Sequence, residues 1–184
     1  MITWTKAYRL PETLLAVAVL CALILWTRTL TLSVGSRTPI QAIWLLALGV
    51  VVVAALPLND SMGLLERTFS RARPLKTIRS AVVTLSVSLG AICLAVVSSA
   101  NGIVTWLFLL SAIAVLATLL LGQNAILVAL TLGVGSIFVE HWVVNTPAPR
   151  LCEAVGVPVS AACFGASLLA FAALPGSKVG PRTE

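Results

Sequence analysis

Apolar residues in this chain gather in long runs, each close to the length of a membrane-spanning helix. A helix needs about 20 apolar residues to cross a hydrocarbon core of about 30 Å. We expect transmembrane helices over residues 10–30, 39–58, 80–98, 103–121, 124–139 and 157–174. The pattern therefore predicts an all-α fold, a polytopic bundle of about six spans. A single transmembrane domain would cover residues 1–184.

Three places decide the number of spans. The run from residue 103 to 139 is about twice the length of one span, so we divide it at Gly122-Gln123-Asn124. Ala100-Asn101-Gly102 predicts a tight turn, because Asn and Gly adopt left-handed backbone angles at little cost. The basic start and first apolar run also fit a signal peptide, but its only cleavage candidate, Ser33-Val34-Gly35, is weak. The five later runs favour a retained first helix.

The most informative polar segment, residues 59–79, joins the second and third spans. It opens with three good helix N-cap residues. Met62, Leu65 and Phe69 then recur at helical spacing, and Pro74 ends that stretch because it lacks a backbone donor. A short basic piece leads into the third span. We expect a short amphipathic helix that lies parallel to the membrane.

Two interpretations of this segment are open. In the first, its arginines only meet anionic lipid headgroups and fix the orientation of the chain. In the second, it is a coupling helix that docks into a cleft on a soluble partner. Met62, Leu65 and Phe69 would then be inserted, with charged residues at the rim of the contact. Those rim residues are Glu66 and Arg67, and Arg71 is also among the expected coupling residues.

Composition supports a membrane protein. The chain is 59% hydrophobic and 10% charged, with a mean hydropathy of +1.07, whereas a soluble domain carries about 25% charged residues. The net charge of +6 is not a nucleic-acid signal, because the basic residues follow the predicted topology. Nine lie on the side of both termini, and only Arg28, Arg37 and Arg150 lie on the other. Both termini should therefore be cytoplasmic.

The outer connection, residues 140–156, contains the only histidine of the chain. Glu140-His141 is not accompanied by a second histidine, and the chain has no HExxH and no Gly-x-Ser-x-Gly motif. We interpret the adjacent Trp142 as an interfacial anchor. The connection is either a plain loop or a short helix that folds back into the outer leaflet. A disulfide between Cys152 and Cys163 is possible if that face is oxidising.

Few polar side chains, and hardly any ionisable ones, fall within the predicted spans. No Asp, Glu, Lys or Arg falls in the middle of a span, which argues against an ion-coupled secondary transporter and an intramembrane hydrolase. The chain has no GxxxxGK[ST] motif, so any ATP hydrolysis would need a separate polypeptide. We therefore expect no enzyme, no metal site and no cofactor in this chain.

Small residues recur four positions apart in two of the predicted spans. These pairs are Ser86 with Gly90 and Ala161 with Gly165. Such spacing lets helices approach closely. It predicts either packing within the bundle or contact with a second copy.

The topology resembles that of ABC-2 type permeases, the membrane subunits of bacterial ABC transporters. Leu64-Leu65-Glu66-Arg67-Thr68, followed by Arg73-Pro74-Leu75, is similar to the Leu-Glu-x-Thr…Arg-Pro-Leu segment of small permeases of this type. The resemblance implies a multi-pass protein of the bacterial plasma membrane. It also implies that the segment between spans two and three is the coupling helix.

The resemblance further implies a working transporter of two permeases and two soluble ABC ATPase subunits, which would bind ATP and Mg²⁺. The function would be ATP-driven export of an amphiphile such as a lipid, an antibiotic or a modified peptide. The alternative is a non-transporting membrane adaptor or immunity protein that binds a partner within the bilayer. The cargo, the transport direction, and whether the dimer is homo- or heteromeric stay open.

Overall fold

The computed structural model describes residues 10–27, 31–32, 40–58, 72–98, 101–121, 124–142 and 148–173. Within these residues the chain forms six α-helices, one short 3-10 helix and a pair of two-residue strands. The elements are α2 (Leu10–Trp26), β1 (Thr31–Leu32), β2 (Ile40–Gln41), α3 (Ala42–Ala55), η1 (Leu56–Leu58), α5 (Ala72–Val97), α6 (Asn101–Leu121), α7 (Ala125–Trp142) and α8 (Ala148–Ala173). β1 and β2 pair antiparallel between α2 and α3.

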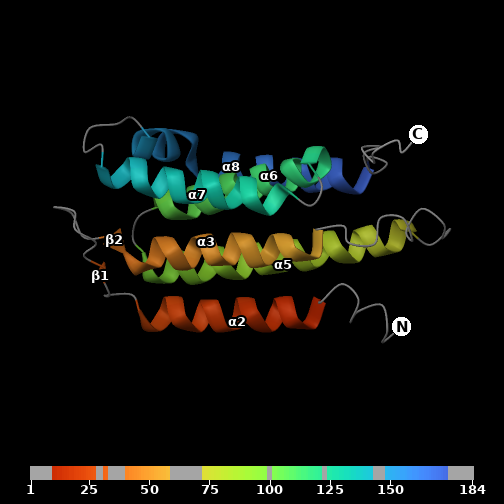
Figure 1. Ribbon diagram of the computed structural model, residues 1–184, viewed down its shortest axis with the longest axis horizontal. Coiled ribbons are helices and arrows are strands. Elements are labelled where there is room, and N and C mark those ends of the chain that lie inside the picture. The colour runs from red at the N-terminus through yellow and green to blue at the C-terminus, as the bar shows by residue number, and fades with distance from the viewer. Residues whose placement is uncertain are drawn as a thin grey trace.

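The helices lie in three layers along one common axis (Figure 1). α2 forms one outer layer and contacts α3 and α5, which form the middle layer. α6, α7 and α8 form the third layer, with α6 packed against the middle layer. Successive helices run in opposite directions, so the start of α2 and the end of α8 lie at the same end of the bundle (Figure 1).

Three of these helices are long and apolar enough to cross a membrane: Lys76–Val97, Asn101–Leu121 and Ala154–Ala173. The other three apolar stretches, Leu10–Trp26, Ala42–Leu58 and Ala125–Val139, are shorter. Large apolar side chains are exposed around the bundle, as at Val96, Leu120 and Leu169, which are 72–75% exposed. Such a surface suits lipid better than water. The structure thus has the architecture of a helical membrane protein.

The core lies where α3, α5 and α6 meet. Val50, Val87 and Leu107 are fully buried there. Gly90 brings α5 close to α3, because a Cβ at this position would lie 2.7 Å from Val50 Cγ1. The small-residue pair that contains Gly90 therefore serves packing within the bundle.

The division of the long apolar run is confirmed, since α6 ends at Leu121 and α7 begins at Ala125. The tight turn expected at Ala100-Asn101-Gly102 is wrong in its last two residues. Asn101 and Gly102 belong to the first turn of α6. Asn and Gly are also tolerated at helix starts, so their turn preference did not fix the boundary.

Two segments expected as connections are partly helical. α5 begins at Ala72, so the basic piece before the third predicted span continues directly into that helix. α8 begins at Ala148, within the expected outer connection, and its axis is interrupted at Gly156. Gly156 has φ 70°, a left-handed conformation that glycine adopts without strain. A short helix therefore precedes the last apolar helix.

Candidate functional site

The predicted coupling residues all fall between η1 and α5. Residues 59–71, which include Met62, Leu65, Glu66, Arg67, Phe69 and Arg71, lie outside the described residues. What the structure gives is the two flanks of this segment. One flank ends at Leu58 and the other begins at Ala72.

The first flank is built by a proline. Pro57 has no backbone N–H and disfavours α-helical geometry in the residue before it. α3 accordingly stops at Ala55, and Leu56–Leu58 forms a single 3-10 turn. The last carbonyls of any helix lack partners within that helix. The carbonyl of Pro57 is such a group, and Pro57 and Leu58 are buried.

The second flank, α5, supplies the hydrogen-bond donor for the Pro57 carbonyl. Arg79, in the second turn of the α5 helix after Pro74, is only 1% exposed. Its Nε donates a hydrogen bond of 2.5 Å to the Pro57 carbonyl oxygen across 22 residues of sequence. A cation is favourable at this position because the end of a helix carries partial negative charge. We call the pair Arg79–Pro57 the flank clamp.

The flank clamp joins the end of η1 to the second turn of α5, the two elements that flank residues 59–71 in sequence. η1 contacts α5, α3 and α2, so the clamp lies among three helices. A force on the segment would therefore act on α3 and α5 together. The sequence places Arg79 at the end of the short basic piece before the third predicted span, and the structure buries it. Its charge gave no signal of this, because its partner is a backbone carbonyl distant in sequence.

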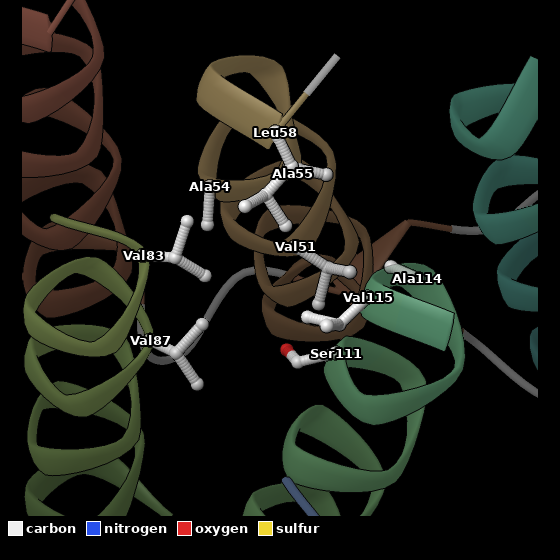
Figure 2. A pocket seen from close by; sticks show the side chains of 9 residues that line it. All are labelled: Val51, Ala54, Ala55, Leu58, Val83, Val87, Ser111, Ala114 and Val115. Atoms are coloured by element: carbon white, nitrogen blue, oxygen red, sulfur yellow. The ribbon is translucent and has the colours of Figure 1, made fainter. Parts of the chain in front are cut away.

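Next to the clamp lies an apolar crevice between α3, α5 and α6 (Figure 2). It is small: its volume is about 10 Å³, which is about the space that one water molecule needs. The lining residues are Val51, Ala54, Ala55, Leu58, Val83, Val87, Ser111, Ala114 and Val115. Ser111 is the one polar member of this lining. The sequence gives no sign of this crevice, because it depends on how three distant segments pack.

The remaining predicted sites fall only partly within the described residues. Cys163 is free and exposed, and the side chain of Cys152 lies outside the described residues. The backbone of Glu140 and His141 belongs to the end of α7, but their side chains are not described. Within the described part of the chain, no three His, Cys, Asp or Glu side chains cluster as metal ligands would. No atom lies within 4 Å of the position that a Cβ of residue 165 would take. The face of α8 that carries Gly165 is therefore not packed against the rest of the described residues.

Comparison with protein-family models, with characterised proteins and with solved structures finds no match for this chain.

Proposed function

We propose that this protein is the membrane-spanning subunit of an ATP-driven exporter, with residues 59–71 docking on a separate soluble ATPase. In this proposal all six apolar helices cross the bilayer, and both termini lie in the cytoplasm. The cargo is an amphiphile, and two membrane subunits form the translocating unit. The chain itself supplies no catalytic group.

The observation that supports this proposal most directly is the flank clamp. The buried hydrogen bond from Arg79 Nε to the Pro57 carbonyl oxygen joins α5 to the turn at the end of α3, and these are the elements that flank residues 59–71 in sequence. A loop that only met lipid headgroups would need no such rigid attachment. A segment that transmits a partner's motion does need it, because a floppy attachment would absorb the displacement.

The architecture is also consistent with an amphiphile. Residues buried where α3, α5 and α6 meet are mostly aliphatic, with a few hydroxyl groups. In the proposed cycle, closure of the ATPase pushes on residues 59–71. The clamp passes this push to α3 and α5 as one body. Their displacement relative to α6 changes the packing at the centre of the bundle.

The test is purification from the native membrane in mild detergent. We expect a soluble ATPase to copurify stoichiometrically with the wild-type protein. Replacing Met62, Leu65 and Phe69 by aspartate should remove it, because charged groups cannot fill an apolar cleft without a large desolvation cost.

A matched control is Leu121→Asp. Leu121 is an exposed apolar residue at the last turn of α6, at the same end of the bundle as η1. This variant should retain the ATPase. Recovery of the wild-type protein alone, or with membrane proteins only, contradicts the proposal and supports an adaptor that binds within the bilayer.

A further inference from the structure

Two cysteines from different layers of the bundle lie next to each other. Cys21 is on α2, in the outer layer, and Cys93 is on α5, in the middle layer. Both are free cysteines, and their thiol groups share a hydrogen bond. Neither thiol belongs to the flank clamp or to the apolar crevice.

The packing of α2 on α5 accounts for this contact. α2 buries one face, along which Val17, Cys21 and Ile24 follow each other at helical spacing. α2 contacts α5 as well as α3. On α5, Cys93 is partly buried and packs against the core of the bundle. The two side chains therefore meet where the outer layer joins the middle layer.

The positions of the two cysteines along their helices agree with this contact. α2 and α5 run in the same direction and end at Trp26 and Val97 (Figure 1). Since a helix rises about 1.5 Å per residue, Cys21 and Cys93 precede these ends by about 8 Å and about 6 Å. Both thiols therefore lie at one level, close to the end of the bundle that carries β1 and β2 (Figure 1).

Packing alone gives no reason for two thiols at this place. A thiol is a weak donor and a weak acceptor, so the hydrogen bond itself contributes little to stability. Aliphatic side chains would fill the same space. What two adjacent cysteines add is redox chemistry, because sulfur atoms in hydrogen-bond contact need only a small side-chain shift to reach disulfide geometry.

We infer that Cys21 and Cys93 form a redox modification site, at which a peroxide joins α2 to α5 through a reversible disulfide. Cys93 reacts first, because it is partly exposed whereas Cys21 is buried. Hydrogen peroxide is the simplest oxidant of this class, and it is small and uncharged. The site does not depend on the transport proposal, because it uses only the packed bundle.

The reaction has two steps. The Cys93 sulfur takes one oxygen atom from the peroxide and becomes a sulfenic acid, and one water molecule leaves. The Cys21 sulfur then attacks the Cys93 sulfur, and the sulfenic oxygen leaves as a second water molecule with the proton of the Cys21 thiol. Two thiols are oxidised to one disulfide, and one peroxide is reduced to two water molecules.

The apolar surroundings favour this product. A disulfide carries no charge, whereas further oxidation of Cys93 to a sulfinic acid would place an ionisable group among apolar side chains, at a large desolvation cost. The new bond would fasten the outer layer to the middle layer. It would also close a long loop of the chain, which restricts the unfolded state and so stabilises the folded one.

The test uses the full chain in lipid nanodiscs, with Cys152→Ser and Cys163→Ser so that only Cys21 and Cys93 remain. A thrombin site is inserted within residues 59–71, between the two cysteines in sequence. The protein is treated with hydrogen peroxide, which catalase then removes, and is cleaved with thrombin. It is denatured in SDS with N-ethylmaleimide and run on a gel without reductant.

We expect the two fragments to stay joined after peroxide treatment and to separate when dithiothreitol is added. The oxidised protein should also melt at a higher temperature than the reduced protein. Cys93→Ser should lose both responses. Size-exclusion chromatography before oxidation shows that each variant is folded.

The matched control is the double variant Cys21→Ala/Ala22→Cys. It keeps the number of thiols and moves one of them to the exposed neighbouring position on the same turn of α2. Its fragments should separate without reductant, because the thiol at position 22 faces away from Cys93.

Two results would overturn the inference. The fragments of the peroxide-treated protein could separate without reductant, with both thiols alkylated by N-ethylmaleimide. The two cysteines would then serve packing only. The control with the moved thiol could also join its fragments as readily as the parent protein. The disulfide would then come from random collision and not from the contact between Cys21 and Cys93.

Discussion

Arg79 carries the most consequential single contact in this bundle. Its guanidinium crosses from α5 to the end of η1 and satisfies a helix-terminal carbonyl that water does not reach. Lysine would not replace it well, because an ammonium group on a flexible stem lacks the fixed geometry of the Nε–H donor. The aliphatic stem of Arg79 also fills interior volume.

We expect Arg79→Ala to destabilise the protein by about 1–3 kcal/mol, because the Pro57 carbonyl would stay buried without this bond. Arg79→Lys should give a smaller loss. For both variants, the protein is heated in detergent to a series of temperatures. At each temperature, size-exclusion chromatography gives the fraction of the protein that is still folded.

Lys76→Ala is the control for Arg79. Lys76 lies one helical turn earlier on α5 and is only partly buried, so its loss should cost less than that of Arg79. Equal melting temperatures for the wild-type protein and Arg79→Ala would mean that the flank clamp contributes nothing to stability.

At the scale of helices, glycine positions show which faces are packed. Gly90 faces Val50, whose β-branched side chain has little freedom to move away. Gly165 on α8 has no neighbouring atom within 4 Å of the place where an alanine methyl group would lie. The two glycines therefore form a natural pair for comparison.

We expect Gly90→Ala to lower the free energy of unfolding by about 1–3 kcal/mol, as overpacking does. Gly165→Ala should be neutral or stabilising by up to about 1 kcal/mol, because alanine favours a helix. Thermal unfolding of both variants in the same detergent tests this. A loss at Gly165 as large as that at Gly90 would show that the outer face of α8 is occupied by another chain.

The helices could largely be predicted from the sequence, because apolar runs of nearly spanning length leave few alternatives to a helix. Their starts were harder. The pattern predicts that Pro74 ends one element, but this prediction is wrong, because Pro74 lies in the first turn of α5, where its missing N–H is no loss. The break in α8 has a visible cause in Gly156 and Pro158, but the sequence does not decide between a loop and a helix before that break.

The site was much harder to predict than the helices. Nothing in the sequence distinguishes Arg79 from the other basic residues of its segment, and only the fold brings Pro57 beside it. The crevice likewise needs Val51, Val83 and Ser111 from three helices. The docking role of residues 59–71 stays a prediction from sequence.

For the molecule as a whole, the antiparallel succession of helices has one important consequence. The ends of α3 and α6 and the start of α5 lie at the same end of the bundle as the start of α2 (Figure 1). Under the proposed orientation this is the cytoplasmic end, where a soluble ATPase can reach residues 59–71. The strand pair β1 and β2 lies at the opposite end (Figure 1).

The proposed function depends above all on contact between residues 59–71 and a soluble ATPase in the cell. A photoreactive amino acid placed at Leu65 tests this contact most directly, with a second placed at Ser36, which stands in the sequence between β1 and β2, as the control. We predict one dominant cross-linked protein from position 65, identified by mass spectrometry as an ATP-hydrolysing subunit, and none of it from position 36. Cross-links from position 65 to lipid or to membrane proteins alone would contradict the proposed contact.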